Sequence, residues 1–303
     1  MELQQLLNFL TLGCVYTTVA LGFTLYFGTV NLINFAHGEL CMLAAFGALM
    51  ATRLFDLHLG QIGWGWILVT TAAGMLLTIG VGWLSYWSIF RRIRGRPLIE
   101  GLLVSIALSM LLRELILHLY PNGGNPQPFP DPFHLEYLQI GDITISYMRL
   151  TALLICGGLT VLFYFLVLRT DVGRVMRAIS QDPEAAVMMG LPVERIIGWS
   201  FVIGSALAGI AGIMTGALYG SVKFDMGIML GVKGFVAAVV GGLDNPRGAL
   251  MGGLMVAGLE VFVVGSFAGG SAYRDIVVFA VLIGLILIRP QGLLGRKVAL
   301  GSS

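Results

Sequence analysis

Charged residues are scarce in this chain of 303 residues. Lys and Arg total 18, Asp and Glu total 16, and charged side chains make up 11% of the sequence. A typical soluble domain carries about 25%. This deficit excludes a water-soluble enzyme, a nucleic-acid-binding protein and a disordered chain. The net charge of +2 is also too small to indicate a basic patch.

Cysteine and catalytic motifs are also scarce. Cys14, Cys41 and Cys156 all lie inside apolar runs, without a CxxC partner or a nearby pair of histidines. The sequence therefore predicts neither a disulfide framework nor a metal site. It contains no Gly-Lys-Ser/Thr phosphate-binding loop and no His-Glu-x-x-His motif. We expect no catalytic residue and no cofactor in this chain.

What the chain has in abundance is apolar sequence. Hydrophobic residues make up 57%, glycine occurs 42 times, and the mean hydropathy is +0.90. Glycine is more frequent in membrane helices than in soluble ones because it lets helices pack closely. Residues 1–303 are therefore predicted to form a single all-α integral membrane domain.

Apolar runs define the membrane spans, since a helix needs about 20 mostly apolar residues to cross a bilayer. Nine runs are candidates: 8–29, 35–52, 64–88, 98–118, 148–168, 197–218, 227–243, 249–267 and 273–289. The runs at 35–52 and 227–243 are the shortest and are interpreted as full spans or as re-entrant half-helices. The prediction is a helical bundle of eight or nine spans, with nine favoured.

Two polar stretches separate these runs. Residues 91–97 (RRIRGRP) are too charged for hydrocarbon, and residues 121–132 hold five prolines. A lipid-exposed helix cannot tolerate that many prolines, because each removes a backbone donor. The surrounding segment 119–147 is therefore predicted to be a proline-rich loop outside the membrane.

Basic residues are unevenly distributed between the two sides of the predicted spans. With the N-terminus outside, twelve Lys and Arg residues fall on the cytoplasmic side, and Arg53, Lys223 and Arg274 fall on the outer side. Because cytoplasmic loops carry an excess of Lys and Arg, this predicts an external N-terminus and a cytoplasmic C-terminus. Segment 119–147 is then external, and 169–196 is the longest cytoplasmic segment.

A short sequence repeat occurs in the two halves of the chain. Residues 28–30 (GTV) precede 35–38 (FAHG), and residues 220–222 (GSV) precede 224–227 (FDMG), each followed by an apolar run. The predicted topology places the two copies of this repeat at opposite faces of the membrane, as in the inverted repeats of transporters. We interpret spans one to four as pairing with spans six to nine; a chance match is the alternative.

The cytoplasmic segment 169–196 contains a short helix with strong boundary signals. Asp182 is a good N-cap, Pro183 suits the first helical position, and Glu184 favours the positive helix start. Gly190 provides the stop at the other end. This pattern predicts either an ordinary capped connector or a docking helix for a cytoplasmic partner.

At this point the chain resembles the permeases of branched-chain amino acid ABC transporters, and in particular the smaller of the two paired permeases. The stretches that carry the resemblance are, in order, 34–39 (NFAHGE), 94–97 (RGRP), 180–190 (SQDPEAAVMMG), 231–243 (GVKGFVAAVVGGL), 248–253 (GALMGG) and 289–293 (RPQGL). They cover almost the whole chain. The proline-rich segment matches none of them.

The resemblance implies a fold, a function and a set of partners. The fold would be that of an ABC importer permease, with a vitamin-B12-importer-like architecture, in a bacterial inner membrane. The partners would be a paralogous second permease, two cytoplasmic ATP-binding subunits that hold ATP and Mg, and a periplasmic solute-binding protein. The segment 169–196 would couple ATP hydrolysis to the spans. The coupling residues it implies are Asp182, Glu184, Ala185, Ala186, Gly190 and Arg195.

Lys233 and Glu260 are ionisable residues inside two adjacent predicted spans. Lys233 lies twelve residues before Asn245 and Glu260 lies thirteen after Arg247, so both sit roughly 18–20 Å from the cytoplasmic turn. Equal depth on adjacent spans predicts a structural ion pair, because a lone charge in hydrocarbon is costly. A direct place in the translocation path and snorkelling to an interface are the alternatives.

Polar residues also open the second span. Asn34 is expected to cap that helix, with His37 and Glu39 in its first turn. In one interpretation Glu39 only complements the helix dipole and His37 lies at the interface. In the other, these three residues form a gate or a contact for a substrate carboxylate at the helix N-terminus.

Small residues recur at a spacing of four in two spans. Gly204, Ala208 and Gly212 form one stripe, and Gly248 and Gly252 form another. This spacing places them on one helix face, where they allow neighbouring helices to approach closely. We interpret both stripes as packing surfaces.

The substrate and the mechanism have alternatives. Relatives of these permeases carry urea and short amides, so a urea or amide importer is the alternative to one for branched-chain or other neutral amino acids. A stand-alone secondary transporter or channel would need a relay of ionisable groups across the membrane. His37, Glu39, Lys233 and Glu260 form no such continuous relay in the sequence.

Overall fold

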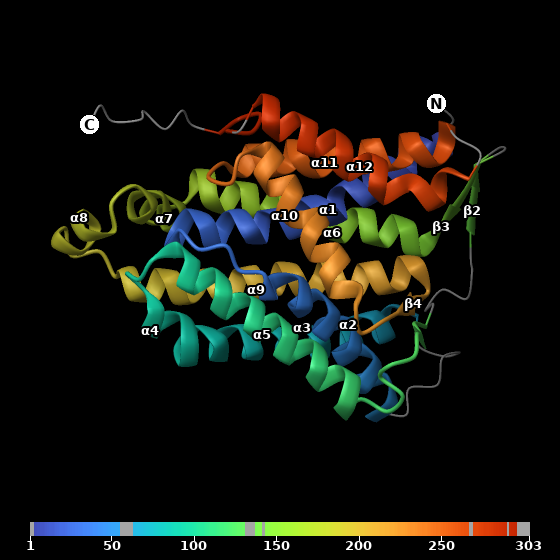
Figure 1. Ribbon diagram of the computed structural model, residues 1–303. Coiled ribbons are helices and arrows are strands. Elements are labelled where there is room, and N and C mark those ends of the chain that lie inside the picture. Colours follow the sequence, from blue (N-terminus) through green and yellow to red (C-terminus); the bar gives the residue numbers. More distant parts are fainter. Residues whose placement is uncertain are drawn as a thin grey trace.

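The computed structural model describes residues 3–54, 63–130, 137–140, 143–266, 269–289 and 291–295. Figure 1 shows a bundle in which most of the long helices lie along one axis, some pointing one way and some the other. In chain order the elements are α1 (Leu3–Val30), α2 (Ala36–Leu54), α3 (Gly63–Ser85), η1 (Tyr86–Phe90), α4 (Arg91–Ile93), α5 (Leu98–Leu119), β1 (Gln127–Pro128), β2 (Tyr137–Ile140), β3 (Ile143–Ser146), α6 (Tyr147–Arg169), α7 (Asp171–Gln181), α8 (Pro183–Met188), α9 (Val193–Tyr219), β4 (Ser221–Val222), α10 (Met226–Gly241), α11 (Pro246–Ser266) and α12 (Gly270–Ile288).

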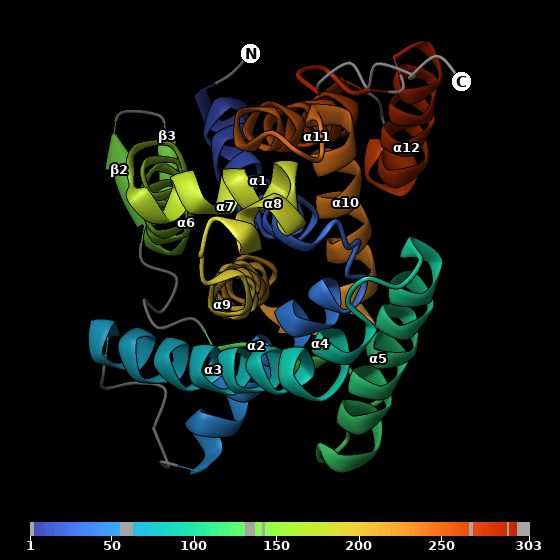
Figure 2. The ribbon, with the colours of Figure 1, turned by 90° about the vertical axis from the view of Figure 1, so that its left-hand side faces the viewer.

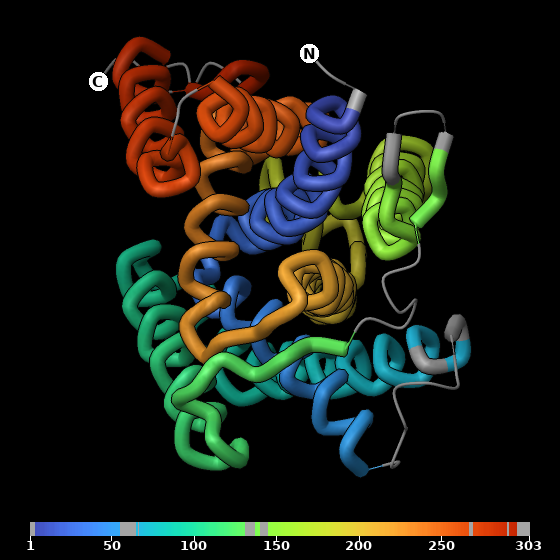
Figure 3. The backbone as a smooth tube through the Cα atoms, turned by 90° about the vertical axis from the view of Figure 1, so that its right-hand side faces the viewer, coloured from blue at the N-terminus to red at the C-terminus, as the bar shows by residue number. Residues whose placement is uncertain are grey.

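Within the described ranges, seven helices are long and apolar enough to cross a membrane: α1, α3 with its continuation to Ile93, α5, α6, α9, α11 and α12. The two shortest apolar runs form α2, of 19 residues, and α10, of 16 residues. Nearly all of α2 is buried. Viewed along the helices, α1 and α9 lie inside the bundle, and α3, α5, α6, α11 and α12 surround them (Figures 2 and 3).

The chain turns back into the bundle after α1 and again after α9. Figure 1 shows α1 and α9 running in opposite directions, with α2 and α10 each starting part of the way along the bundle. Gly38 of α2 lies against Gly227 and Gly231 of α10, so the first turns of the two short helices touch. These two turns contain the ends of the short sequence repeat, residues 35–38 and 224–227.

A π-helical segment, η1, carries the third span further than its apolar run. The predicted span ends at residue 88, but the helix continues through η1 to Ile93. The arginines expected to break the helix lie at its end, where Glu194 pairs with Arg91 at 2.9 Å and with Arg94 at 3.0 Å. Gly95, with a φ of +81°, then makes the turn into α5.

The proline-rich segment contains short strands that its composition did not predict. Gln127 and Pro128 pair with Val222 and Ser221, which joins this segment to the turn before α10. Arg53, at the end of α2, donates a hydrogen bond to Gln127 at 3.1 Å. Strands β2 and β3 form an antiparallel hairpin before α6. Residues 131–136 and 141–142 of the predicted loop lie outside the described residues.

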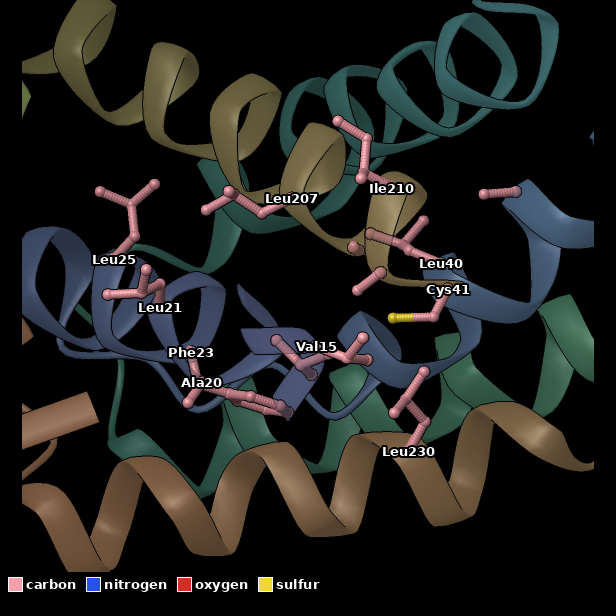
Figure 4. Close-up of a cluster of buried hydrophobic side chains, with 14 of the residues drawn as sticks. Val15, Ala20, Leu21, Phe23, Leu25, Leu40, Cys41, Leu207, Ile210 and Leu230 are labelled. Carbon is pink, nitrogen blue, oxygen red and sulfur yellow. The ribbon is translucent and has the colours of Figure 1, made fainter. Parts of the chain in front are cut away.

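The core lies where α1, α2, α9 and α10 meet, and Figure 4 shows part of it. Gly212 of α9 lies against the backbone of Cys41, and Gly204 lies against the ring of Tyr26. Ala208, between them in the stripe, is fully buried. A larger side chain at these positions would push α9 away from α1 and α2.

The second glycine stripe joins α11 to α10. Gly248 lies against the backbone of Gly241, and Gly252 lies against the carbonyl of Ala237. This close approach fixes α10 against α11, and so sets the distance between the charged side chains that the two helices carry.

Candidate functional site

The segment between α6 and α9 forms two short helices at the end of the bundle that also holds the last described residues (Figure 1). Asp182 caps α8, because its Oδ1 accepts a hydrogen bond from the amide of Ala185 at 2.9 Å. Gly190 closes the helix with a φ of +76°, a conformation that favours glycine. The sequence signals for this helix therefore correspond to its actual start and end.

The outer face of α8 is apolar although it is exposed. Val187, Met188 and Met189 are 57%, 82% and 68% exposed, respectively. Ala186, on the opposite side, is fully buried, and its carbonyl accepts a hydrogen bond from Leu191 at 3.1 Å. Three adjacent exposed apolar side chains on a water-facing turn are typical of an interaction surface.

A cavity of about 980 Å³ lies beside α8 and is lined by Asp182 and Glu184, by the turn at 94–96 and by the last turn of α1. Arg195, the remaining residue in the implied coupling set, is exposed on α9. It lines a different cavity, of about 430 Å³, together with Trp87 and Trp199. Arg195 therefore lines a different cavity from that of Asp182 and Glu184.

Asn34 and His37 hold the first turn of α2 against its neighbours. Asn34 caps the turn, since its Oδ1 accepts a hydrogen bond from the amide of Ala36 at 3.1 Å. His37 is fully buried, lies 3.1 Å from the carbonyl of Val19, and packs edge-on against Phe23. His37 therefore connects α2 to α1.

Glu39 lies where α2, α5 and α10 meet. It is 1% exposed, and its Oε1 accepts a hydrogen bond from Ser109 of α5 at 3.4 Å. Its other oxygen lies against Gly227 in the first turn of α10. The carboxylate thus faces the positive ends of two helices, its own and that of α10.

The structure brings Lys233 and Glu260 together within a ring of four charges. Lys233 Nζ lies 3.3 Å from Glu260 Oε2 and 2.8 Å from Asp275 Oδ1. Arg274 Nε lies 3.0 Å from Glu260 Oε1 and 3.5 Å from Asp275 Oδ1. Charges alternate in sign around the ring, which joins α10, α11 and α12. Such pairing is what allows charges to be buried at this depth.

Tyr16 adds α1 to this ring by donating its hydroxyl to Glu260 Oε2 at 2.6 Å. Sequence reasoning found neither Tyr16 nor Asp275, and it placed Arg274 in an outer segment, whereas the residue belongs to α12. The available signal was an Arg-Asp dipeptide at the start of an otherwise apolar run. Tyr16 gave no such signal, because tyrosine is common in membrane helices.

The described residues show no grouping of three or more His, Cys, Asp or Glu side chains that could hold a metal ion. The three cysteines are free thiols. The features that the described side chains form are paired charges, helix ends and one exposed apolar turn.

These features define a class of protein, a polytopic helical membrane protein with two short helices that meet in its interior. Residues 5–286 match the family described as the branched-chain amino acid transport system permease component. The chain belongs to that family, as the sequence motifs indicated, and the family comprises permease subunits that are not themselves enzymes.

Relatives match the chain over nearly its full length. The high-affinity branched-chain amino acid transport system permease protein BraD of Pseudomonas aeruginosa is 33% identical over 97% of this chain and 96% of its own length. The corresponding LivH of Escherichia coli K12 has the same identity and coverage. LivM of Escherichia coli K12 is 26% identical over 94% of this chain and 68% of its own length.

Proposed function

We propose that this chain is a permease subunit of an ABC importer that carries branched-chain or other neutral amino acids across the inner membrane. The match to BraD and LivH over 97% of the chain is the observation that carries the proposal. In this assignment the N-terminus is outside and α7, α8 and the C-terminus are cytoplasmic. With α2 and α10 added to the seven longer helices, nine elements enter the membrane in a vitamin-B12-importer-like arrangement.

The exposed turn at Val187–Met189 is the proposed contact for the ATP-binding subunits. Those partner subunits bind ATP and Mg. They hold a helix of this chain whose shape depends on five residues: Asp182, Glu184, Ala185, Ala186 and Gly190. The turn is joined closely to a long helix, since Ala186 of α8 is buried and α9 begins only four residues after Met189, at Val193. Closure of the ATP-binding subunits would then move α9 as a rigid element.

A paralogous permease is the proposed second half of the pore. The match to LivM supports such a partner, because one organism holds both a LivH and a LivM. A periplasmic solute-binding protein would deliver substrate to the end of the bundle that holds the N-terminus. Asn34, His37 and Glu39 would set the α2–α10 junction between the two ends of the path.

Uptake by the reconstituted importer tests this function. The chain is purified with its co-encoded subunits, placed in vesicles with ATP on the cytoplasmic side, and given radiolabelled leucine, valine or urea with the binding protein. We expect ATP-dependent uptake of leucine and valine and no uptake of urea. Uptake of urea alone would favour the amide importer, and ATP-independent accumulation would favour a secondary transporter.

A further inference from the structure

Two cavities flank Arg274 at the end of the bundle that holds the N-terminus. One has a volume of about 390 Å³ and is lined by Lys233 and Tyr16. The other has a volume of about 360 Å³ and is lined by Glu260. Arg274 lines both cavities, so it stands between them. Leu12, Leu218 and Tyr219 also line both cavities, so withdrawal of Arg274 would open one part of the boundary between the space beside Lys233 and the space beside Glu260.

The larger cavity combines four charged side chains, those of Lys223, Asp225, Lys233 and Arg274, with an apolar wall. Its apolar lining comes from α1, α9 and α10: Leu12, Val15, Leu218, Met226, Met229 and Leu230. A mostly apolar concavity with a few convergent polar groups is the usual form of a small-molecule site, and sites of about 300–1,000 Å³ are typical. An aliphatic side chain can be buried against this wall without the cost of leaving a polar group unpaired.

The dipeptide Arg274–Asp275 presents one positive and one negative group from adjacent positions of α12. Asp275 places its carboxylate 2.8 Å from Lys233 Nζ, and Arg274 places its guanidinium 3.0 Å from Glu260. An amino acid zwitterion offers the same two charges from groups on one carbon atom. Asp275 and Arg274 therefore pair with Lys233 and Glu260 in the way that the carboxylate and the ammonium group of a free amino acid could.

Exchange between the dipeptide and a zwitterion would leave no buried charge unpaired. Lys233 and Glu260 have side chains only 6% and 2% exposed, so either one alone would be costly. Of the residues of α12, only Gly270, Val278 and Leu282 are buried, whereas most of α9 is buried, so α12 packs at the edge of the bundle. An uncharged amide cannot make the exchange, because it replaces neither charge.

We propose that Lys233, Glu260 and the apolar cavity form a binding site for a zwitterionic aliphatic amino acid, which opens when α12 withdraws Arg274 and Asp275. Lys233 binds the carboxylate, Glu260 binds the ammonium group, and the wall of Leu12, Val15 and Leu230 contacts the side chain. This inference rests on the proposed function and adds to it the place and the chemistry of substrate recognition within the permease.

Leucine binding to the assembled importer, in nanodiscs and without the binding protein, tests the site directly. The double variant Arg274→Ala with Asp275→Ala removes the tethered pair and leaves the net charge unchanged. Because the site is then always open, leucine should bind about tenfold more tightly than to the wild type. Lys233→Gln added to this double variant should abolish binding. Arg92→Gln, at an exposed arginine that lines neither cavity, is the control and should change affinity less than about twofold.

Competition with two analogues separates charge recognition from simple apolar binding. Leucinamide lacks the carboxylate and 4-methylpentanoate lacks the ammonium group, so each would replace only one of the two charges that Arg274 and Asp275 supply and would leave Lys233 or Glu260 with one partner fewer. Both should compete with leucine at least about a hundredfold more weakly than valine does. Asp275→Asn keeps the shape of the ring and should raise leucine affinity in the same direction as the double variant.

Two results would overturn the site. One is a double variant that assembles, retains the ATPase activity of its partners, and binds leucine no better than the wild type does. The other is leucinamide competing as well as valine. Failure of the proposed function is distinguishable, because there the wild-type importer supplied with binding protein would take up no branched-chain amino acid at all. Leucine uptake that is unaffected by Lys233→Gln would exclude only this site.

Discussion

The carboxylate of Glu39 on α2 lies against Gly227 in the first turn of α10. Two helix N-termini therefore meet inside the bundle, and one acidic side chain faces both. The contact depends on glycine, since Gly38 and Gly231 bring the two backbones together at the same point. This junction links the two halves of the chain and is the centre of the predictions that concern α2 and α10.

Gly227→Ala should destabilise the protein. An added methyl group would overlap both the Glu39 carboxylate and the carbonyl of Gly38, and overpacking of this kind costs about 1–3 kcal/mol. Thermal unfolding of the purified protein in detergent should show a lower Tm. Gly80→Ala is the control, because no atom lies within 4 Å of its added methyl group; an equal fall in Tm for both variants would contradict the close contact.

Glu39→Gln tests the charge at the junction with little change in volume. The neutral amide loses the attraction to the two helix ends, which is worth about 0.3–2 kcal/mol in total stability. We expect the variant to fold and assemble but to import leucine more slowly. Radiolabelled uptake and the rate of ATP hydrolysis check this, and unchanged transport with unchanged coupling would exclude Glu39 as a gate residue.

Met188→Glu tests the exposed turn as a docking surface. Met188 is 82% exposed, so a glutamate there should leave the fold intact while placing a charge in an apolar contact. Co-purification of the ATP-binding subunits and ATP-driven uptake should both fall sharply. Val172→Glu is the matched control, since Val172 is also apolar and exposed but lies on α7. Loss of the subunits in both variants alike would argue against a specific contact at α8.

Charge inversion tests the ring of four. Exchanging only Lys233 and Glu260 would place a glutamate beside Asp275 and a lysine beside Arg274, so it should not rescue either single reversal. Inverting all four, with Arg274→Asp and Asp275→Arg as well, restores the alternation of charge. Each single reversal should cost about 3–5 kcal/mol, as breaking a buried pair does. Yield and Tm of the membrane-embedded protein give the readout, and rescue by the two-residue exchange would contradict the ring.

Composition and motifs were enough to predict the class of protein and its family. The shortage of charge and the length of the apolar runs require a helical membrane protein, and the motif order along the chain indicated the family that the comparisons confirm. The limits of α8 were also accessible, because Asp182, Pro183 and Gly190 act through local backbone geometry. Features that arise within one or two helical turns can be read from sequence.

Features that depend on several helices could not be predicted. Asp275 and Tyr16 join the charged ring only because α1, α10, α11 and α12 meet at one depth. Arg195 resembles a coupling residue in sequence, but the rotation of α9 directs it to a different cavity from that of Asp182. The strands at Gln127 and Ser221 form between segments almost a hundred residues apart. The rotation and depth of each helix are set by packing, which no single segment encodes.

ATP-driven leucine uptake into vesicles is the most direct test of the central claim, that this chain is a conduit driven by other subunits. Vesicles with the chain, its partner permease and the ATP-binding subunits should accumulate leucine when ATP and the binding protein are supplied. Vesicles with this chain alone should not. Accumulation of leucine by the lone chain, with or without ATP, would contradict the account.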